Sequence, residues 1–401
     1  EEVDGTHGKI GDVDVVWNIT PSDDNAYQNN LDETLLKQAD ASADDKIDLF
    51  LVEADYALKY VNTDYTMPVA DLGITEDEVA DQYQYTKDVM TDADGNLKGL
   101  SWQGCPGTMI YRRDIAKEVF GTDDPDEVGK LFKDYPTILE TAQTLKDAGY
   151  RIFSSDAEMN VFSGDSAWVV DGTLNVDQSR IDYMDLCVDL YQNDLTAYAS
   201  QWSTPWYQAM AGEVPILTAD IQSNADDSVN VWDADQFAEA TKGLDTTTVF
   251  AFGLPSWGVL TMRDNVGETS GLWGVCSGPA AGFDGGTYIG ISSQSERKDT
   301  AWEFVKFCAS KEAQEATAAS AIPAYKGCDQ IWADTYSQYD AEKLLAGAYY
   351  EGSLGNPWWD KNFTDANTIL TEAMTNIWAD ENADIQAILD QCDADIEAIT
   401  K

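Results

Sequence analysis

Histidine is almost absent from this 401-residue chain, which contains only His7. One histidine near the start cannot supply a Ser–His–Asp triad, a Cys–His pair or a histidine-rich metal site. Many classes of hydrolase and metalloenzyme are therefore excluded. We expect no catalytic residues, no metal ion and no cofactor.

Cysteine is scarce and scattered. The six cysteines are Cys105, Cys187, Cys276, Cys308, Cys328 and Cys392. No Cys-X-X-Cys occurs, which excludes the usual zinc and thioredoxin spacings. Cys308 lies in the apolar run FVKFCAS and is typical of a small core residue. A Cys308–Cys328 disulfide and six free thiols both remain open, so cysteine content does not identify the compartment.

Long apolar runs are also missing, since no stretch of eighteen or more apolar residues occurs. The sequence therefore predicts no membrane-spanning helix. The opening EEVDGTHGKI lacks the charged and apolar regions of a signal peptide. These residues fit a cytosolic protein and an exported protein whose signal has been removed equally well.

Basic residues are few: 24 Lys and Arg stand against 73 Asp and Glu, giving a net charge of −49. Nucleic acid and anionic lipid surfaces require a basic face, so both are excluded as partners. The acidic balance indicates a self-repelling, soluble surface, with a halophilic origin as the alternative. The length suits two or three domains, and 43% hydrophobic residues with 13 Trp can fill large cores.

What the chain does have is a repeated strand–helix pattern. Residues 10–17 (IGDVDVVW) alternate and then become apolar, which predicts a first strand; a helix carrying Tyr27, Leu31 and Leu35 follows. Residues 46–60 (KIDLFLVEADYALKY) begin as an apolar strand of the kind found in covered parallel sheets. The order strand, helix, strand, helix predicts a doubly wound α/β fold, in which ligands gather beyond the carboxyl ends of the strands.

The later part of the chain continues this pattern. Residues 285–292 (GGTYIGIS) predict a strand with Tyr288 and Ile291 inward, and residues 300–313 predict a helix capped near Asp299 and Thr300. Helices are also expected at 136–150, 180–193 and 364–400, and a Gly/Pro-rich hinge at 104–107.

Residues 92–103 begin like a calcium loop, but Leu97 and Gln103 stand where glycine and glutamate are needed, so a β-turn is the better interpretation.

Five landmarks occur along the chain in an order typical of one family. They are Asp55–Tyr56 after an apolar strand, Tyr111–Arg112–Arg113–Asp114, Ala211–Gly212–Glu213–Val214, Gly278–Pro279 ahead of Gly285–Gly286, and IPAYKG at residues 322–327. In these features the chain resembles the extracellular solute-binding proteins of ABC importers, and among them the sugar-binding, maltose-binding-protein-like branch. It departs from maltose-binding protein at Gln103–Gly104–Cys105, where that protein has an acidic ligand, so maltose specificity does not carry over.

The resemblance implies a type II periplasmic-binding-protein-like α/β fold with two lobes that close on a ligand. One lobe would comprise residues 1–109 plus 287–320, and the other 110–286 plus 321–401, with hinges near 104–110 and 283–288. It further implies a monomeric, non-enzymatic protein that binds an oligosaccharide and delivers it to ABC transporter permease subunits. The expected location is the outer face of a Gram-positive cell membrane, where the protein would be held as a lipoprotein.

Sugars present apolar faces and a rim of hydroxyl groups, so their sites combine flat aromatic rings with short polar side chains. The candidates are residues of these types at predicted strand ends and loops: Asp55, Tyr56, Trp257, Trp102, Gln103, Phe283, Asp284, Asn18, Ser22, Asp23, Trp358 and Trp359. Structural roles compete with several of them, such as a helix cap for Asp55 and a core position for Trp257. Two other functions remain open: the same fold binding a peptide or polyamine, and a glycoside hydrolase.

Overall fold

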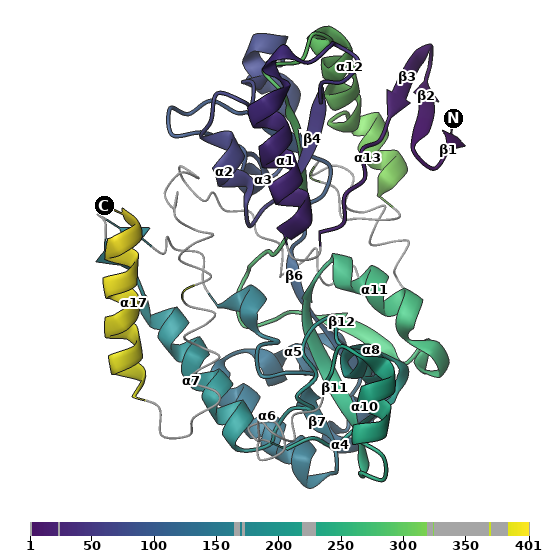
Figure 1. Cartoon of the computed structure of the whole chain (residues 1–401). Coiled ribbons are helices and arrows are strands. Elements are labelled where there is room, and N and C mark those ends of the chain that lie inside the picture. The colour runs from purple at the N-terminus through teal and green to yellow at the C-terminus, as the bar shows by residue number, and fades with distance from the viewer. Residues whose placement is uncertain are drawn as a thin grey trace.

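Two lobes, each built on its own β-sheet, lie one above the other in the computed structural model (Figure 1). The structure describes residues 2–22, 25–163, 169–170, 173–218, 230–318, 324, 369 and 384–400. We call the lobe built on strands β4, β13 and β5 the first lobe, and the lobe built on strands β10, β11, β6, β12 and β7 the second lobe. The α/β architecture expected from the sequence is confirmed.

The sheet of the first lobe joins strands from distant parts of the chain. Its order is β4 (Leu49–Glu53), β13 (Thr287–Ile291) and β5 (Gly99–Ser101), and β13 runs antiparallel to both neighbours. Side chains alternate between the two faces, as strand geometry requires. Val52 and Tyr288 face a core with the first helices, whereas Ile289 faces a second core with Trp302.

Helices cover both faces of this sheet. In chain order they are α1 (Ala26–Lys37), α2 (Ala57–Val61), α3 (Gln84–Asp88), α12 (Lys298–Cys308) and α13 (Lys311–Thr317). Figure 1 shows α12 and α13, drawn in green, in the same lobe as the purple N-terminal helices. Leu31 and Leu35 of α1 are buried as predicted. Helix α12 begins at Lys298 with Arg297 at the cap position, so the expected cap at Asp299 or Thr300 was placed too late.

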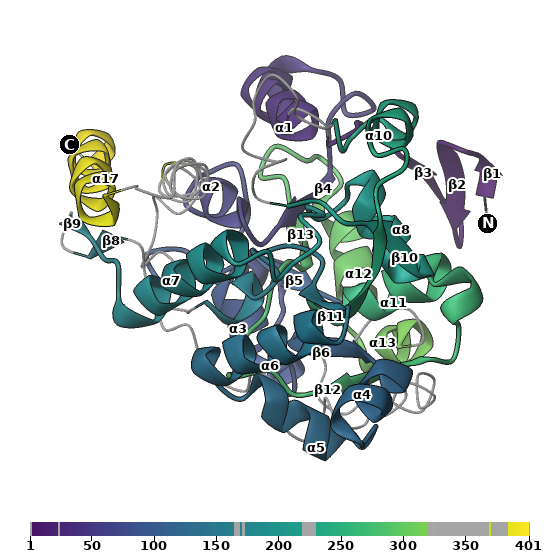
Figure 2. The same cartoon turned by 90° about the horizontal axis from the view of Figure 1, so that it is seen from below.

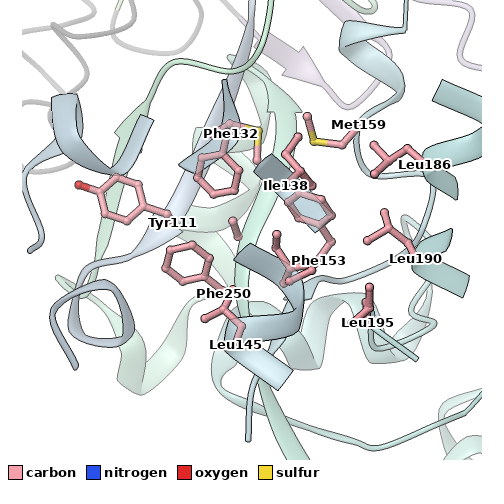
Figure 3. Packing of buried hydrophobic residues seen from close by; sticks show 14 of the residues in the cluster. Tyr111, Phe132, Ile138, Leu145, Phe153, Met159, Leu186, Leu190, Leu195 and Phe250 are labelled. Atoms are coloured by element: carbon pink, nitrogen blue, oxygen red, sulfur yellow. The ribbon is translucent and has the colours of Figure 1, made fainter. Parts of the chain in front are cut away.

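The second lobe has a larger sheet of order β10 (Glu213–Pro215), β11 (Thr246–Pro255), β6 (Gly107–Arg112) and β12 (Trp273–Cys276), with β7 (Arg151–Phe153) parallel to β11. Its helices are α4 (Arg113–Phe120), α5 (Pro125–Gly129), α6 (Tyr135–Asp147), α7 (Gln178–Gln192), α8 (Thr204–Ala211), α10 (Ala234–Ala240) and α11 (Trp257–Asn265). Figure 3 shows one of its cores, where Phe132 packs with Phe153 and Phe250. Apolar side chains on both faces explain why β6 and most of β11 are buried.

The predicted helix at 136–150 is confirmed as α6. Asp134 accepts the Thr137 N–H in a side-chain cap, and Pro136 lies in the first turn, where a missing N–H costs nothing. Gly149, with φ of 95°, follows the helix end. The helix predicted at 180–193 is confirmed as α7.

Residues 10–17 are not the first strand of the doubly wound sheet, so that prediction was wrong. They span the end of β2 (His7–Ile10), a turn, and β3 (Val13–Val16). These strands belong to a separate antiparallel sheet in which β2 lies between β1 (Glu2–Asp4) and β3. Gly11 adopts φ of 60° between β2 and β3, a conformation that glycine tolerates best. Gly11 and Asp12 therefore form a hairpin turn inside the alternating segment that was predicted to be a single strand.

The remaining elements are short or lie toward the C-terminus. Strands β8 (Val169–Val170) and β9 (Thr173–Leu174) form a two-stranded sheet, and α17 (Ile385–Thr400) lies beside β9 (Figure 2). The 3₁₀ turns are Gln38–Asp40, Val69–Leu72, Glu76–Val79, Lys130–Phe132, Asn160–Phe162 and Gly267–Thr269. Within the ranges given above, no helix has the length and apolar character needed to cross a membrane.

Some predictions lie outside the described residues. These are Cys328 and its possible partner role in a Cys308–Cys328 disulfide, and the 322–327 loop apart from residue 324. The first part of the 364–400 helical region, up to residue 383 and apart from residue 369, also lies outside them. Cys105, Cys187, Cys276, Cys308 and Cys392 are free thiols. The division into 1–109 plus 287–320 and 110–286 plus 321–401 stays a prediction.

Candidate functional site

Three carboxylates come together where the chain passes between the lobes. Glu53 ends β4, Asp55 follows two residues later, and Asp284 precedes β13. Thr287 is paired with Glu53 across the β4–β13 ladder, and its Oγ1 donates to Glu53 Oε1 at 2.7 Å. This pairing holds residues of the two strands side by side although they are more than 230 positions apart in the sequence.

The surroundings make these carboxylates costly to charge. Burial raises the pKa of Glu53, the charges of Asp55 and Asp284 raise it further, and the Thr287 hydrogen bond opposes this. Burial and the Asp55 charge likewise raise the pKa of Asp284. The side chains of Asp55 and Asp284 still reach solvent. The three groups thus form a negative surface where protein atoms displace much of the stabilising water.

Tryptophan rings lie directly beside this surface. Trp257, the first residue of α11, donates from Nε1 to the backbone oxygen of Asp284 at 3.3 Å. Trp202 stacks on Trp257 with ring centroids 5.2 Å apart and planes inclined by 19°. Its other neighbour is the fully buried Trp206, at 5.0 Å. Trp202 keeps 50% of its surface exposed, so the pair offers an aromatic face to solvent.

Trp202 was missed by sequence reasoning. It precedes the Ser203–Thr204–Pro205 start of α8 and belongs to no strand or helix, so no burial periodicity accounts for a large aromatic there. That is the signal that could have found it. Its φ of 70° is unusual for a bulky side chain and marks local backbone strain.

Tyr56 and Phe283 lie beside the carboxylates but also belong to the packing. Tyr56 is the N-cap residue of α2 and meets Tyr60 edge-on at 6.2 Å, so Asp55 is not the cap residue. Phe283 packs against Tyr85 at 4.7 Å and against cores of both lobes. Its backbone bridges Pro106, which brings the two interlobe segments together.

Trp102 and Gln103 lie in the segment that bonds to both ends of the carboxylate group, through Ser101 Oγ to the Thr287 oxygen and through the Cys105 oxygen from the Asp284 N–H. Trp102 is half-buried and packs with the core that contains Ile289 and Trp302, on the opposite face of the first-lobe sheet from Tyr56. The Gln103 backbone exchanges hydrogen bonds with the Ser101 hydroxyl. Both residues therefore take part in anchoring the start of the Gly104–Gly107 bend.

Asn18 lines a different pocket. This pocket, of about 580 Å³, lies between the N-terminal sheet and α1, and its lining includes Trp17, Thr34 and Ile47. None of the three carboxylates lines it. Ser22 is exposed. Asp23, Trp358 and Trp359 lie outside the described residues.

The Asp92 loop has the structure of a turn. Asp92 Oδ1 accepts the backbone N–H groups of Asp94 and Asn96 at 3.0 and 2.8 Å, and Lys98 lies 3.3 Å from its other oxygen. Burial would raise the pKa of Asp92, but hydrogen bonds from Asn96 and Lys98 lower it. Among the residues with defined positions, no cluster of three or more Asp, Glu, His and Cys is arranged to hold a metal ion.

Comparison with known structures identifies the fold. A sugar-binding protein MalE from Xanthomonas citri superposes with a TM-score of 0.65 at 15% identity, covering 93% of this chain and 88% of that one. The galacto-N-biose-/lacto-N-biose I-binding protein of Bifidobacterium longum gives 0.63 at 13%, covering 92% and 86%. The maltose-bound MalE3 of T. maritima gives 0.61 at 14%, covering 93% and 88%. No curated protein sequence matches significantly.

The family follows from the sequence model that the chain matches. Residues 6–343 match the model of the bacterial extracellular solute-binding proteins. This span contains both sheets, the two interlobe segments and the carboxylate and tryptophan groups described above. The chain therefore belongs to the family of bacterial extracellular solute-binding proteins.

Proposed function

We propose that this protein captures an oligosaccharide between its two lobes and delivers it to the permease of an ABC importer, without changing it chemically. The observation that carries the proposal is the half-exposed Trp202 stacked on Trp257, next to Asp284 and Asp55. Stacked indole rings suit the apolar face of a sugar, and carboxylate oxygens accept bonds from its hydroxyl groups. Three proteins of the same fold bear the names of sugar binders.

Closure of the lobes would complete the site. Trp202 and Trp257 belong to the second lobe, whereas Glu53 and Asp55 belong to the first. The hinge would comprise residues 104–110 and 283–288, which include the Pro106–Phe283 bridge and the positive-φ Gly285 and Gly286. A ligand that contacts both lobes stabilises the closed state, which the permease would recognise. We place the protein outside the cell as a monomer, tethered as a lipoprotein.

The test is a thermal-melt screen of the purified protein against oligosaccharides of several linkage classes. A ligand at 100 times its dissociation constant adds about 2.7 kcal/mol of stability, which gives a clear rise in Tm. Trp202→Ala should abolish most of that rise, whereas Trp232→Ala, which removes another exposed indole, should not.

Two results would contradict the proposal. If no oligosaccharide raises the Tm, the ligand is a peptide, a polyamine or another solute. If the bound sugar is recovered as shorter products, the protein is a glycoside hydrolase. Chromatography of the ligand after overnight incubation distinguishes a binding protein from an enzyme.

A further inference from the structure

Two carboxylates of the site, Glu53 and Asp284, carry a charge that no described side chain balances. Within the described ranges, no ion pair involves Glu53 or Asp284, although ion pairs involve many other acidic residues of the chain. The neighbouring Asp55 adds a third negative charge and raises the pKa of both groups. A neutral sugar can accept hydrogen bonds from protonated carboxyl groups or donate to charged ones, but it cannot neutralise this charge.

The tryptophan pair is an independent sign of a ligand at the same place. Trp202 holds a half-exposed ring in a strained backbone conformation. Next to it, Ser203 Oγ and Trp206 Nε1 are fully buried and have no hydrogen-bond partner among the residues that the structure describes. Buried polar atoms nearly always have partners, so two unpartnered donors beside the tryptophan pair mark an unusual site.

The two ends of the site differ in polarity. Helices α8 and α11 both begin at the tryptophan pair, where the helix dipole disfavours a positive charge. The carboxylate group begins at Asp284, whose backbone oxygen accepts the Trp257 Nε1 hydrogen bond. A neutral ring therefore suits the tryptophan end, and a cation suits the carboxylate end.

We infer that the ligand is a saccharide that carries an ammonium group, such as an oligomer of an amino sugar. Its sugar ring lies against Trp202, and its ammonium group lies among Glu53, Asp55 and Asp284. The inference rests on the proposed function and narrows it to one class of saccharide. It also accounts for Glu53 and Asp284, two neighbouring carboxylates that no described basic side chain neutralises.

Calorimetry with matched ligands tests the inference. The probes are glucosamine oligomers of two to four residues, their N-acetylated forms, and glucose oligomers of the same linkage. We expect the glucosamine oligomers to bind at least tenfold more tightly than either neutral series, and this advantage to shrink as salt screens the charges. If a neutral series binds as tightly or more tightly, the inference is overturned while the proposed function stands. If no saccharide in these series or in the thermal-melt screen binds, both are overturned.

A variant pair localises the effect. Asp284→Asn should weaken glucosamine-oligomer binding at least tenfold more than it weakens neutral-oligomer binding, because only the former loses a charge–charge contact as well as a hydrogen bond. Asp71→Asn, at an exposed position elsewhere in the first lobe, is the matched control and should change neither. An equal loss for both ligand types in Asp284→Asn would show that the carboxylate serves hydroxyl groups only, which overturns the inference. The unliganded melting curve of each variant verifies that it is folded.

Discussion

Glu158 is a carboxylic acid enclosed in the second lobe, and replacing it with glutamine should stabilise the protein at alkaline pH. Its side chain is buried, and Ser154 Oγ donates a hydrogen bond to it. Burial raises the pKa of Glu158 from 4.5 to about 8, against the opposing effect of the Ser154 bond. Desolvation in the interior therefore disfavours the charged form of Glu158 relative to its protonated form.

The direction of the pH dependence follows from the raised folded-state pKa. The folded protein holds the Glu158 proton more tightly than the unfolded chain does, so this group favours folding fully below pH 4.5. That advantage disappears as pH rises from 4.5 through about 8. At about 1.4 kcal/mol per pH unit, the change in the free energy of unfolding is up to about 5 kcal/mol.

Urea unfolding at pH 5, 7 and 9 measures the effect. The free energy of unfolding of Glu158→Gln relative to the wild type should increase steadily from pH 5 to pH 9, by several kcal/mol. Repulsion among the many surface carboxylates affects both proteins alike and cancels in the difference. Glu140→Gln, at an exposed position on α6, should show a difference that does not change with pH. A pH-independent difference for Glu158→Gln would refute the reasoning.

Two further predictions concern packing. A Cβ atom at Gly282 would collide with the backbone oxygen of Val161, so Gly282→Ala should lower the free energy of unfolding by roughly 3 kcal/mol, whereas Gly5→Ala, where nothing lies within 4 Å, should change it little. Trp302→Ala should lower the free energy of unfolding by about 3–5 kcal/mol, because the ring is only 7% exposed in the first-lobe core. Phe307→Ala, five residues further along the chain and 54% exposed, is its control. Chemical denaturation measures both, and equal losses in variant and control would contradict the packing described for that site.

The strand–helix units could be predicted because their causes are local. An apolar run makes residues 49–53 the strand β4, and a proline at one end and a glycine at the other define α6. The covered parallel setting expected for β4 was wrong, because β4 is an antiparallel edge strand on which Leu51 is exposed. The error at residues 10–17 has a local cause as well. Alternation continues across the Gly11–Asp12 turn, so periodicity alone does not reveal a hairpin, and only the turn residues do.

The site could be predicted only in part, because its geometry depends on long-range pairing. Asp55, Asp284 and Trp257 each follow or precede a strand, which is why their positions could be selected from the sequence. Their proximity depends on the β4–β13 register and on the hydrogen bond from Trp257 to the Asp284 backbone. Trp202 could not be found by periodicity, since it reaches Trp257 from a segment with no regular structure, 55 residues earlier.

The central position of β13 has a consequence for synthesis of the protein. Strand β13 lies between β4 and β5, and in the described sheet neither of those strands has another neighbour. A ribosome makes β4 and β5 early, yet the strand that joins them emerges only after every strand of the second-lobe sheet. The second lobe can therefore form its sheet while the first lobe still waits for residues 287–291. The sheet of the first lobe therefore lacks its central strand until residues 287–291 have been made.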